Sequence, residues 1–576
     1  MDATDITNAI KNTDNDFRDR IDRWDKDFDR WDLKNPKDKG SFEYMTSVKS
    51  RDTDIDIVSN APRTFSDDVQ AILSSSERQI IARMAEPAGE DMREAIGKFE
   101  RLLEYAFEKA DERLIRLLFP TLKESSVWYS LVRGWVAGRF LIYKIGKDVI
   151  FDFLSLDPRW LRYRVGANGL LWTAYTTSYS SEALIDEYGD AGEKAISISG
   201  WKVWEKQPKT VDVIDYWKDM GNGKKMNAII CNNEWLKEPE TYVMKSMPVL
   251  IHPVSTRPPV RGSTGSEMEG YGDSIFAPNR EIDDLLNDMG SVWASHAKRL
   301  AEQPIVNYKG ENGVEIKDTL HYAGGVINLP MNQNKLEPVP MKEISPTLVN
   351  LVNWLDNMRV RGSLPDINVG SPPPSGTLYN LVQETSNRVF NPQLRNLNSF
   401  YSNACRLIEE QLLEGGVGGE KIGKFKIRGT RKNEYFETEI TPIDLKRPHI
   451  IKVEFTARTP WTQLDTYQIA DMAKRLGLPD SFIHEYILKL PDPKGLGDQS
   501  AIEMAEHSPK LAMLRAIQAL MQTGRQDEAE SLMEDMYKMT MQEEANTGGA
   551  NGMEQPPPIS SGATGEAERA VSLPTQ

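Results

Sequence analysis

The segment from Tyr271 to Leu413 constrains the fold most, because it alternates long helices with stretches that cannot be helical. Apolar residues at three- and four-residue spacing predict a helix from about Ser274 to Gln303, roughly 42 Å long at 1.5 Å per residue. A second predicted helix, from about Thr377 to Leu413, is roughly 55 Å long. Helices of this length are hard to bury in one small core. We therefore expect them to contact other copies of the chain, as in a ring.

A β-rich insert and a return helix follow the first of these helices. The insert, residues 304–342, contains strand-like pieces separated by glycine and proline. Ser345 has the chemistry of an N-cap and Pro346 suits the first helical position, so together they predict the start of a helix within residues 343–362.

A loop and a very long helix come next. Residues 363–376 carry repeated proline and glycine, which break a helical hydrogen-bond ladder. The long helix occupies residues 377–414, and Pro392 is expected to kink it near its middle.

Composition sets limits on the function. The chain has 576 residues, 39% of them hydrophobic, and a net charge of −16. A broad basic face for tight nucleic-acid binding is therefore not expected, although an acidic wall would let DNA slide past.

Cys231 and Cys405 are too few for a disulfide framework, and we interpret them as incidental thiols of a reducing compartment. The sequence has no apolar run of membrane-spanning length and no signal peptide, so we expect a soluble intracellular protein.

The first 60 residues form a charged arm. Phe17, Ile21, Trp24, Phe28 and Trp31 recur in it at helical spacing. Such an amphipathic helix should dock on the body of its own chain or a neighbouring copy, or on an external partner.

Residues 61–270 have a mixed α/β pattern. Two helices are expected, at Ser66–Met84 and Asp91–Leu118, followed by short alternating runs typical of antiparallel strands. Residues 415–480 predict a hairpin, a third strand and a helix. Residues 481–545 predict further helices, and the composition of 546–576 is typical of disorder.

Several short matches lie within this element order. Tyr271-Gly-Asp-Ser274 leads into the first long helix, Ser375-Gly-Thr377 opens the last, and Glu384-Thr-Ser-Asn-Arg388 precedes Pro392. The arrangement resembles the portal protein, or head-tail connector, of tailed bacteriophages. The resemblance covers roughly residues 60–545. It implies an α+β, mainly helical portal fold that assembles as a ring. Its parts are a wing (61–270 and 415–480), a stem (271–303 and 343–362), a clip (304–342), a tunnel loop (363–376), the long helix (377–414) and a crown (481–545).

The same resemblance implies a structural protein of the virion and no enzyme. The ring usually has twelve subunits, occupies one capsid vertex and passes double-stranded DNA during packaging and ejection. It is assembled in the host cytoplasm. Expected partners are the terminase large subunit, head-tail adaptor proteins, and the major capsid and scaffolding proteins. No membrane, cofactor, metal or catalytic residue is expected.

Candidate residues for these roles fall into groups. The tunnel-loop candidates are Ser363, Asn368, Ser371 and Ser375, and a plain helix connector is the alternative. Lys298 and Arg299 are candidate channel cations, or they pair with Glu302 and a neighbour. The clip candidates for docking the motor and adaptors are Tyr308, Lys309, Lys317 and His321.

Two alternatives to a portal remain. One is another structural ring or adaptor of the virion. The other is a nucleotide-dependent hydrolase that uses Gly418–Lys424, which has Walker-loop spacing, but Phe425 replaces the Ser or Thr that would hold Mg²⁺. The scattered histidines lack metal-ligand spacing. The basic residues around Lys426 fit the charged outer face of a half-buried strand better than a phosphate site.

Overall fold

The computed structural model describes residues 2–34, 55–84, 90–146, 148–197, 210–254, 260–261, 268–269, 271–301, 305–309, 326–330, 335–338, 346–363, 376–414, 416–417, 424–431, 434–441, 449–456, 460–479, 482–488, 513, 517, 521, 532 and 533. The chain divides into two compact units, Met1–Pro493 and Lys494–Gln576. All elements with assigned bounds belong to the first unit. The predicted crown helices lie mostly outside the described residues, and the tail 546–576 lies outside them entirely.

The described residues combine helices with mostly antiparallel sheets, in agreement with the predicted α+β class. The helices are α1 (Ala3–Trp31), α2 (Ala61–Ser75), α3 (Glu90–Arg116), α4 (Leu122–Val132), α5 (Ser181–Tyr188), α6 (Asp190–Ser197), α7 (Arg280–Ala301), α8 (Pro346–Arg361), α9 (Gly376–Glu414) and α11 (Pro460–Arg475). The strands are β1 (Glu77–Met84), β2 (Trp135–Ile145), β3 (Asp148–Leu156), β4 (Leu161–Gly166), β5 (Gly169–Ser180), β6 (Thr210–Gly221), β7 (Lys224–Cys231), β8 (Glu234–Val243), β9 (Val249–Pro253), β10 (Val260–Arg261), β11 (Met268–Glu269), β12 (Ile305–Lys309), β13 (Val326–Pro330), β14 (Lys335–Pro338), β15 (Phe425–Arg431), β16 (Glu434–Ile440) and β17 (His449–Thr456). Short turns of 3₁₀ and π-helix lie at Pro158–Trp160 and Ile483–Ile487.

The largest core forms where α3, α4 and α9 pack on three small sheets, β1–β17, β3–β2–β9 and β15–β16. Aromatic side chains fill its centre. Phe107 of α3 lies 5.3 Å from Tyr401 of α9 between ring centroids, and Phe140 of β2 lies 5.7 Å from Phe400. Burying each such ring contributes about 1.5–3 kcal/mol. This core is the largest apolar cluster of the described residues.

A five-stranded antiparallel sheet, β4–β5–β6–β7–β8, stands beside this core. Its apolar residues form three further clusters: one with β2, β3 and β9, one with the start of α1, and one with α5 and α6. Arg139 of β2 links the sheets, because its guanidinium donates to Asp215 of β6 at 2.6 Å and to Asp152 of β3 at 3.1 Å. Asn227 of β7 donates to the same Asp215 carboxylate at 2.8 Å. The half-buried charge of Arg139 is therefore matched by two carboxylates.

The predicted helix over Ser66–Met84 is wrong in its second half. The helix α2 ends at Ser75, Ser76 has an extended ψ of 140°, and Glu77–Met84 is strand β1. β1 pairs antiparallel with β17, with Ile80 opposite Val453. Its partner lies far away in the sequence, so local periodicity did not reveal the strand.

Two other predicted elements need correction. The third strand of residues 415–480, β17, does not join the β15–β16 hairpin among the described residues, since it pairs with β1. The first stem helix begins at Arg280 and not at Ser274, because residues 271–279 form turns. The return helix and the long helix have nearly the predicted bounds.

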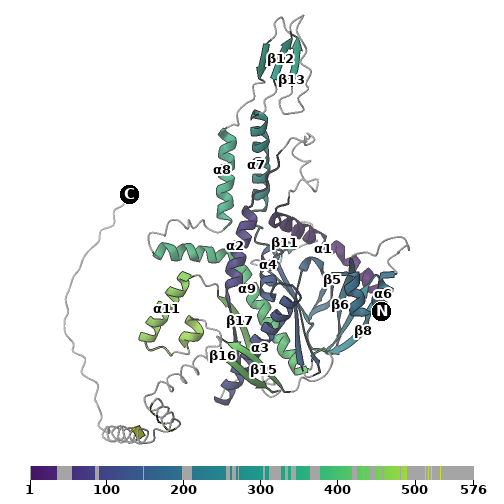
Figure 1. Ribbon diagram of the computed structural model, residues 1–576, viewed down its shortest axis with the longest axis vertical. Coiled ribbons are helices and arrows are strands. Elements are labelled where there is room, and N and C mark those ends of the chain that lie inside the picture. Colours follow the sequence, from purple (N-terminus) through teal and green to yellow (C-terminus); the bar gives the residue numbers. More distant parts are fainter. Residues whose placement is uncertain are drawn as a thin grey trace, which may run out of the picture. The chain divides into compact units, whose positions relative to one another are not determined.

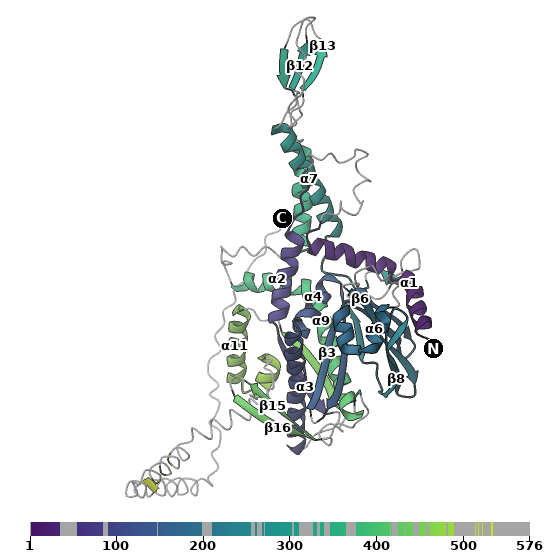
Figure 2. The same cartoon turned by 45° about the vertical axis from the view of Figure 1, so that its right-hand side comes forward.

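The helices α7 and α8 lie side by side (Figures 1 and 2). The strands β12, β13 and β14 form a three-stranded sheet in the insert between them, in which β12 is parallel to β13 and antiparallel to β14. In both views β12 and β13 lie beyond the ends of α7 and α8 that are farther from the other sheets. The predicted order of helix, β insert and return helix is thus present.

Candidate functional site

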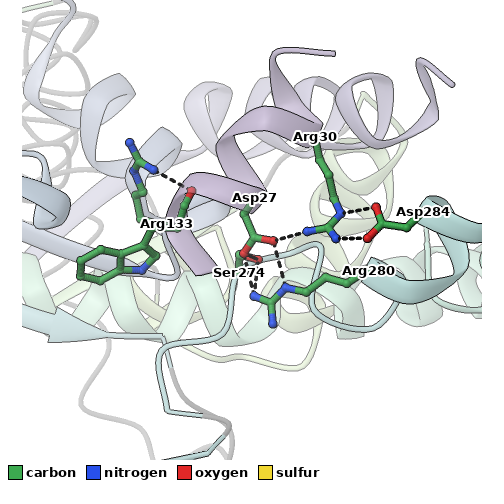
Figure 3. A network of polar contacts seen from close by, with 7 residues as sticks. Asp27, Arg30, Arg133, Ser274, Arg280 and Asp284 are labelled. Carbon is green, nitrogen blue, oxygen red and sulfur yellow. Dashed lines mark hydrogen bonds and ion pairs between the residues drawn. The ribbon is translucent and has the colours of Figure 1, made fainter. Parts of the chain in front are cut away.

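The base of α7 is held by a buried carboxylate from the N-terminal helix (Figure 3). Asp27 of α1 is 1% exposed. It accepts hydrogen bonds from Arg280 Nε at 2.9 Å and Nη2 at 2.6 Å, from Ser274 Oγ at 2.6 Å and from Arg30 Nη1 at 3.1 Å. Arg30 also donates to both carboxylate oxygens of Asp284, at 3.2 and 2.6 Å. Two guanidinium groups therefore balance two carboxylates where α1 meets α7.

The burial of Asp27 has an energetic consequence. A carboxylate without water is stable only when its oxygens accept hydrogen bonds and its charge is matched. The bidentate contact with Arg280 supplies the strongest geometry for this purpose. Loss of the Asp27 carboxylate would leave Arg280 without the group that matches its charge, and breaking a buried pair in this way costs about 3–5 kcal/mol.

The Tyr271–Ser274 motif precedes α7 and packs against Trp135 of β2. Gly272 has φ +76°, and a Cβ built on it would overlap the indole Nε1 of Trp135. Gly134, with φ +68°, packs against the Gly272 carbonyl. Tyr271 packs edge-on against Trp135, with ring centroids 5.3 Å apart. Glycine at 272 is thus required both by its backbone conformation and by the indole.

An extended segment, residues 55–59, runs along α7. The backbone N–H groups of Ile55, Ile57 and Ser59 donate to Ser295 Oγ, Ser291 Oγ and Asn287 Oδ1 at 2.9, 2.9 and 2.8 Å. Ser295 also donates back to the Ile55 carbonyl at 3.3 Å, whereas the Ser291 hydroxyl donates to the carbonyl of Asn287 within α7 at 2.8 Å and lies 3.3 Å from the Ile57 carbonyl. We call this set of contacts the serine ladder. It holds an extended chain on a helix through side chains spaced four residues apart, which share one helix face.

The helix α1 docks on the body of its own chain, which is one of the alternatives predicted for the charged arm. Its aromatic stripe makes the contacts. Phe17 lies 5.1 Å from Tyr163, Trp24 lies 6.4 Å from Trp135, and Trp31 lies 5.3 Å from Trp128 between ring centroids. Edge-to-face pairs of this kind each contribute about 0.5–1.5 kcal/mol beyond area burial.

The helices α7 and α8 meet at the same end as the Asp27 contacts. Asn279 Nδ2 donates to the Arg359 carbonyl at 3.0 Å, and a Cβ on Gly362 would overlap Asn279 Oδ1. Asp283 is buried nearby, and burial raises its pKa to about 6 despite the opposing charges of Arg359 and Arg30. The helix α7 therefore begins among several acidic and basic groups.

The contacts of Asp27 described above include none of the predicted site residues. Lys298 is half-buried on α7 and is not free of contacts. Arg299 is in the same helix, but its side chain lies outside the described residues, as do the side chains of Tyr308 and Lys309 on β12. Ser363 follows α8 and donates to the Val360 carbonyl at 3.2 Å. The remaining candidates lie outside the described residues: Asn368, Ser371, Ser375, Lys317 and His321.

Pro392 lies inside α9, which continues through it. The proline has no N–H to donate, and the kink expected there stays a prediction.

The basic residues near Lys426 are arranged as a strand with a charged outer face. Lys426 and Arg428 both pair with Glu437 on the neighbouring strand, while Ile427 between them is fully buried. Most of the Walker-like loop, 418–423, lies outside the described residues.

Among the described residues, no group of His, Cys, Asp and Glu has the geometry of a metal site, and no helix is long and apolar enough to cross a membrane.

The sequence did not predict the contacts of Asp27. The one related signal in the sequence is the tripeptide Asp-Arg-Trp, which occurs at 22–24 and again at 29–31 and shows that charged residues recur regularly along this helix.

A scan against protein-family models gave no match, and neither did a search of curated proteins.

Proposed function

We propose that this chain is the subunit of a portal ring, which forms a channel for double-stranded DNA at one vertex of a viral capsid. The order of its elements supports the proposal: α7, a small β insert, α8, an intervening segment and the long helix α9. The hairpin of α7 and α8 would be the stem, and the insert would be the clip on which terminase and adaptor proteins dock. Capsid and scaffolding proteins would contact the outside of such a ring.

The observation that carries this proposal is the apolar surface of α8. Leu355 is the one buried residue of this helix. Large apolar side chains elsewhere on α8 are exposed: Val349, Leu351, Trp354, Met358 and Val360. Leu351, Trp354 and Met358 share one face, since they follow three- and four-residue spacing. A helix with such a face is stabilised by a partner, and exposed apolar patches mark protein contacts.

Charge and position favour a second copy of the chain as that partner. Glu281 in the first turn of α7 and Arg361 in the last turn of α8 are both exposed and carry opposite charges. These ends lie at the same level, because Asn279 contacts Arg359. In a ring, α8 of one copy next to α7 of the following copy would bring opposite charges together. Such a contact joins two different surfaces, as closed rings require.

The net charge of −16 fits a channel that does not hold DNA tightly. In the proposed ring of about twelve copies, Lys298 and Arg299 would supply local positive charge. The segment containing Ser363, Asn368, Ser371 and Ser375 would narrow the bore.

Native mass spectrometry and negative-stain electron microscopy of the full chain test the proposal. We expect closed rings with a central channel. Trp354→Ala, which removes a side chain that is 56% exposed, should shift the population toward monomers without lowering the thermal unfolding midpoint of the monomer. Trp160→Ala is the matched control, since Trp160 is 46% exposed on the body. A wild-type chain that stays monomeric under all conditions would rule the proposal out.

A further inference from the structure

We infer that the N-terminal region is a strap that fixes the direction of α7 relative to the five-stranded sheet, with Asp27 as its positioning residue. The strap consists of residues 2–34 and 55–60. It contacts the sheet along one part of its length and α7 along another, so it connects two elements that are far apart in the sequence.

The first half of the strap belongs to the sheet. Ile6 and Ile10 are buried against its apolar face. Asp14 pairs with Arg162 of β4 at 2.7 Å. Asp25 accepts two hydrogen bonds from Arg159, at 2.6 and 3.0 Å. With apolar burial and ion pairs spread over several turns, α1 should move together with the sheet.

The second half belongs to α7. Asp27 binds Arg280 and Arg30 binds Asp284, so the end of α1 is attached to the first turn of α7. The serine ladder then follows α7 from Asn287 to Ser295. The strap thus contacts α7 at its base and again along its length. Two separated attachment points fix the direction of a rod, whereas a single point allows it to pivot.

Another element in contact with α7 is α8, and it is poorly suited to the same task. Leu355 is its buried residue, and much of its apolar surface is exposed. A helix so weakly anchored to the body moves with its neighbour. Without the strap, α7 and α8 would pivot as a pair.

Asp27 is the residue through which the strap acts, because both guanidinium groups at this junction contact it. It touches Arg280 of α7 directly and orients Arg30, which reaches Asp284. If the proposed ring is correct, the direction of α7 also sets the angle between neighbouring copies. The strap would then limit how many subunits close the ring. This consequence rests on the proposed function, but the strap itself does not.

Hydrogen–deuterium exchange of the full chain, read by mass spectrometry, tests the strap. In Asp27→Asn we expect the amides of residues 280–301 to exchange about tenfold faster, while strands β4–β8 keep their protection. Asp25→Asn is the matched control. It loses a bidentate arginine contact on the same helix, but that contact is with Arg159 and not with Arg280 of α7, so α7 should keep its wild-type exchange. A general loss of stability would instead accelerate exchange everywhere.

Equal α7 exchange in Asp27→Asn and the wild type would overturn the strap, as would a uniform increase across the chain. If Asp27→Asn does not fold, Asp284→Asn tests the same junction, because that carboxylate is 44% exposed and its loss is milder. Subunit numbers from native mass spectrometry test the ring consequence, and we expect a broader distribution for Asp27→Asn. If the wild type forms no rings, the proposed function fails, and the exchange experiment still decides the strap.

Discussion

Asp283 lies one position before Asp284 in the first turn of α7, and its side chain is buried. Burial raises its pKa from 3.8 to about 6, with Arg359 and Arg30 opposing and Asp284 adding to the shift. A raised pKa means that the folded state binds the proton more tightly. The ionised group therefore costs stability above about pH 6, up to about 3 kcal/mol at 1.4 kcal/mol per pKa unit.

We expect Asp283→Asn to raise the thermal unfolding midpoint at pH 7.5, because the neutral amide removes this cost. The gain should shrink as the pH falls below 6, become small near pH 4 and vanish only below the ordinary pKa of 3.8, where Asp283 is protonated in both states. Midpoints measured by scanning calorimetry between pH 4 and 8 check the prediction. Asp356→Asn, at an exposed partner of Arg359, should change little. A gain independent of pH would contradict the assignment.

The requirement for glycine at position 272 can be tested by a single substitution. Gly272→Ala combines an unfavourable positive φ with overlap against Trp135, so we expect a loss of about 2–4 kcal/mol. Gly223→Ala is the control. Gly223 also has a positive φ, but no atom lies within 4 Å of its built Cβ, so its cost should be about 1 kcal/mol. Denaturant unfolding followed by tryptophan fluorescence measures both. Equal losses would show that steric overlap is unimportant.

The serine ladder predicts an effect that is confined to one element, the extended segment 55–59. Ser291→Ala leaves the N–H of Ile57 without its acceptor, so amide exchange across residues 55–59 should increase. Ser291→Thr keeps a hydroxyl at the same place and should restore most of the protection. Exchange mass spectrometry of the two variants checks the prediction. An increase in Ser291→Thr as large as in Ser291→Ala would mean that the hydroxyl does not hold the segment.

Elements with strong local patterns were predictable from the sequence, and those that depend on distant partners were not. The long helix α9 and the return helix α8 follow from apolar spacing and from the Pro346 start signal. Strand β1 was taken for helix, because its partner β17 is remote. The role of Asp27 was hidden for a similar reason. It is one of 86 acidic residues, and only burial beside Arg280 distinguishes it.

At the scale of the whole molecule, removal of the N-terminal helix should have a larger effect than removal of the C-terminal unit. Deleting residues 2–34 would expose the aromatic surface around Trp128 and Trp135 and leave Arg280 without Asp27. We expect a lower thermal midpoint and increased binding of a hydrophobic dye. Deleting residues 494–576, which form a separate compact unit, should leave the main unfolding transition unchanged. Equal effects of the two deletions on the thermal midpoint would contradict the conclusion that α1 stabilises the main unit and that residues 494–576 do not.

The geometry of the serine ladder also limits its own length. Two residues of extended chain advance about 6.7 Å, whereas four residues of α-helix advance about 6.0 Å. Each successive rung is therefore displaced by roughly 0.7 Å relative to the previous one. The displacement is tolerable over the contacts at Ser295, Ser291 and Asn287, but a fourth rung would be displaced by roughly 2 Å, beyond the reach of a normal hydrogen bond. Because of this mismatch, the hydrogen bonds between the extended segment and α7 can stay aligned only over a few rungs. A single-residue insertion within 55–59 should therefore break these hydrogen bonds and not simply shift the segment along α7.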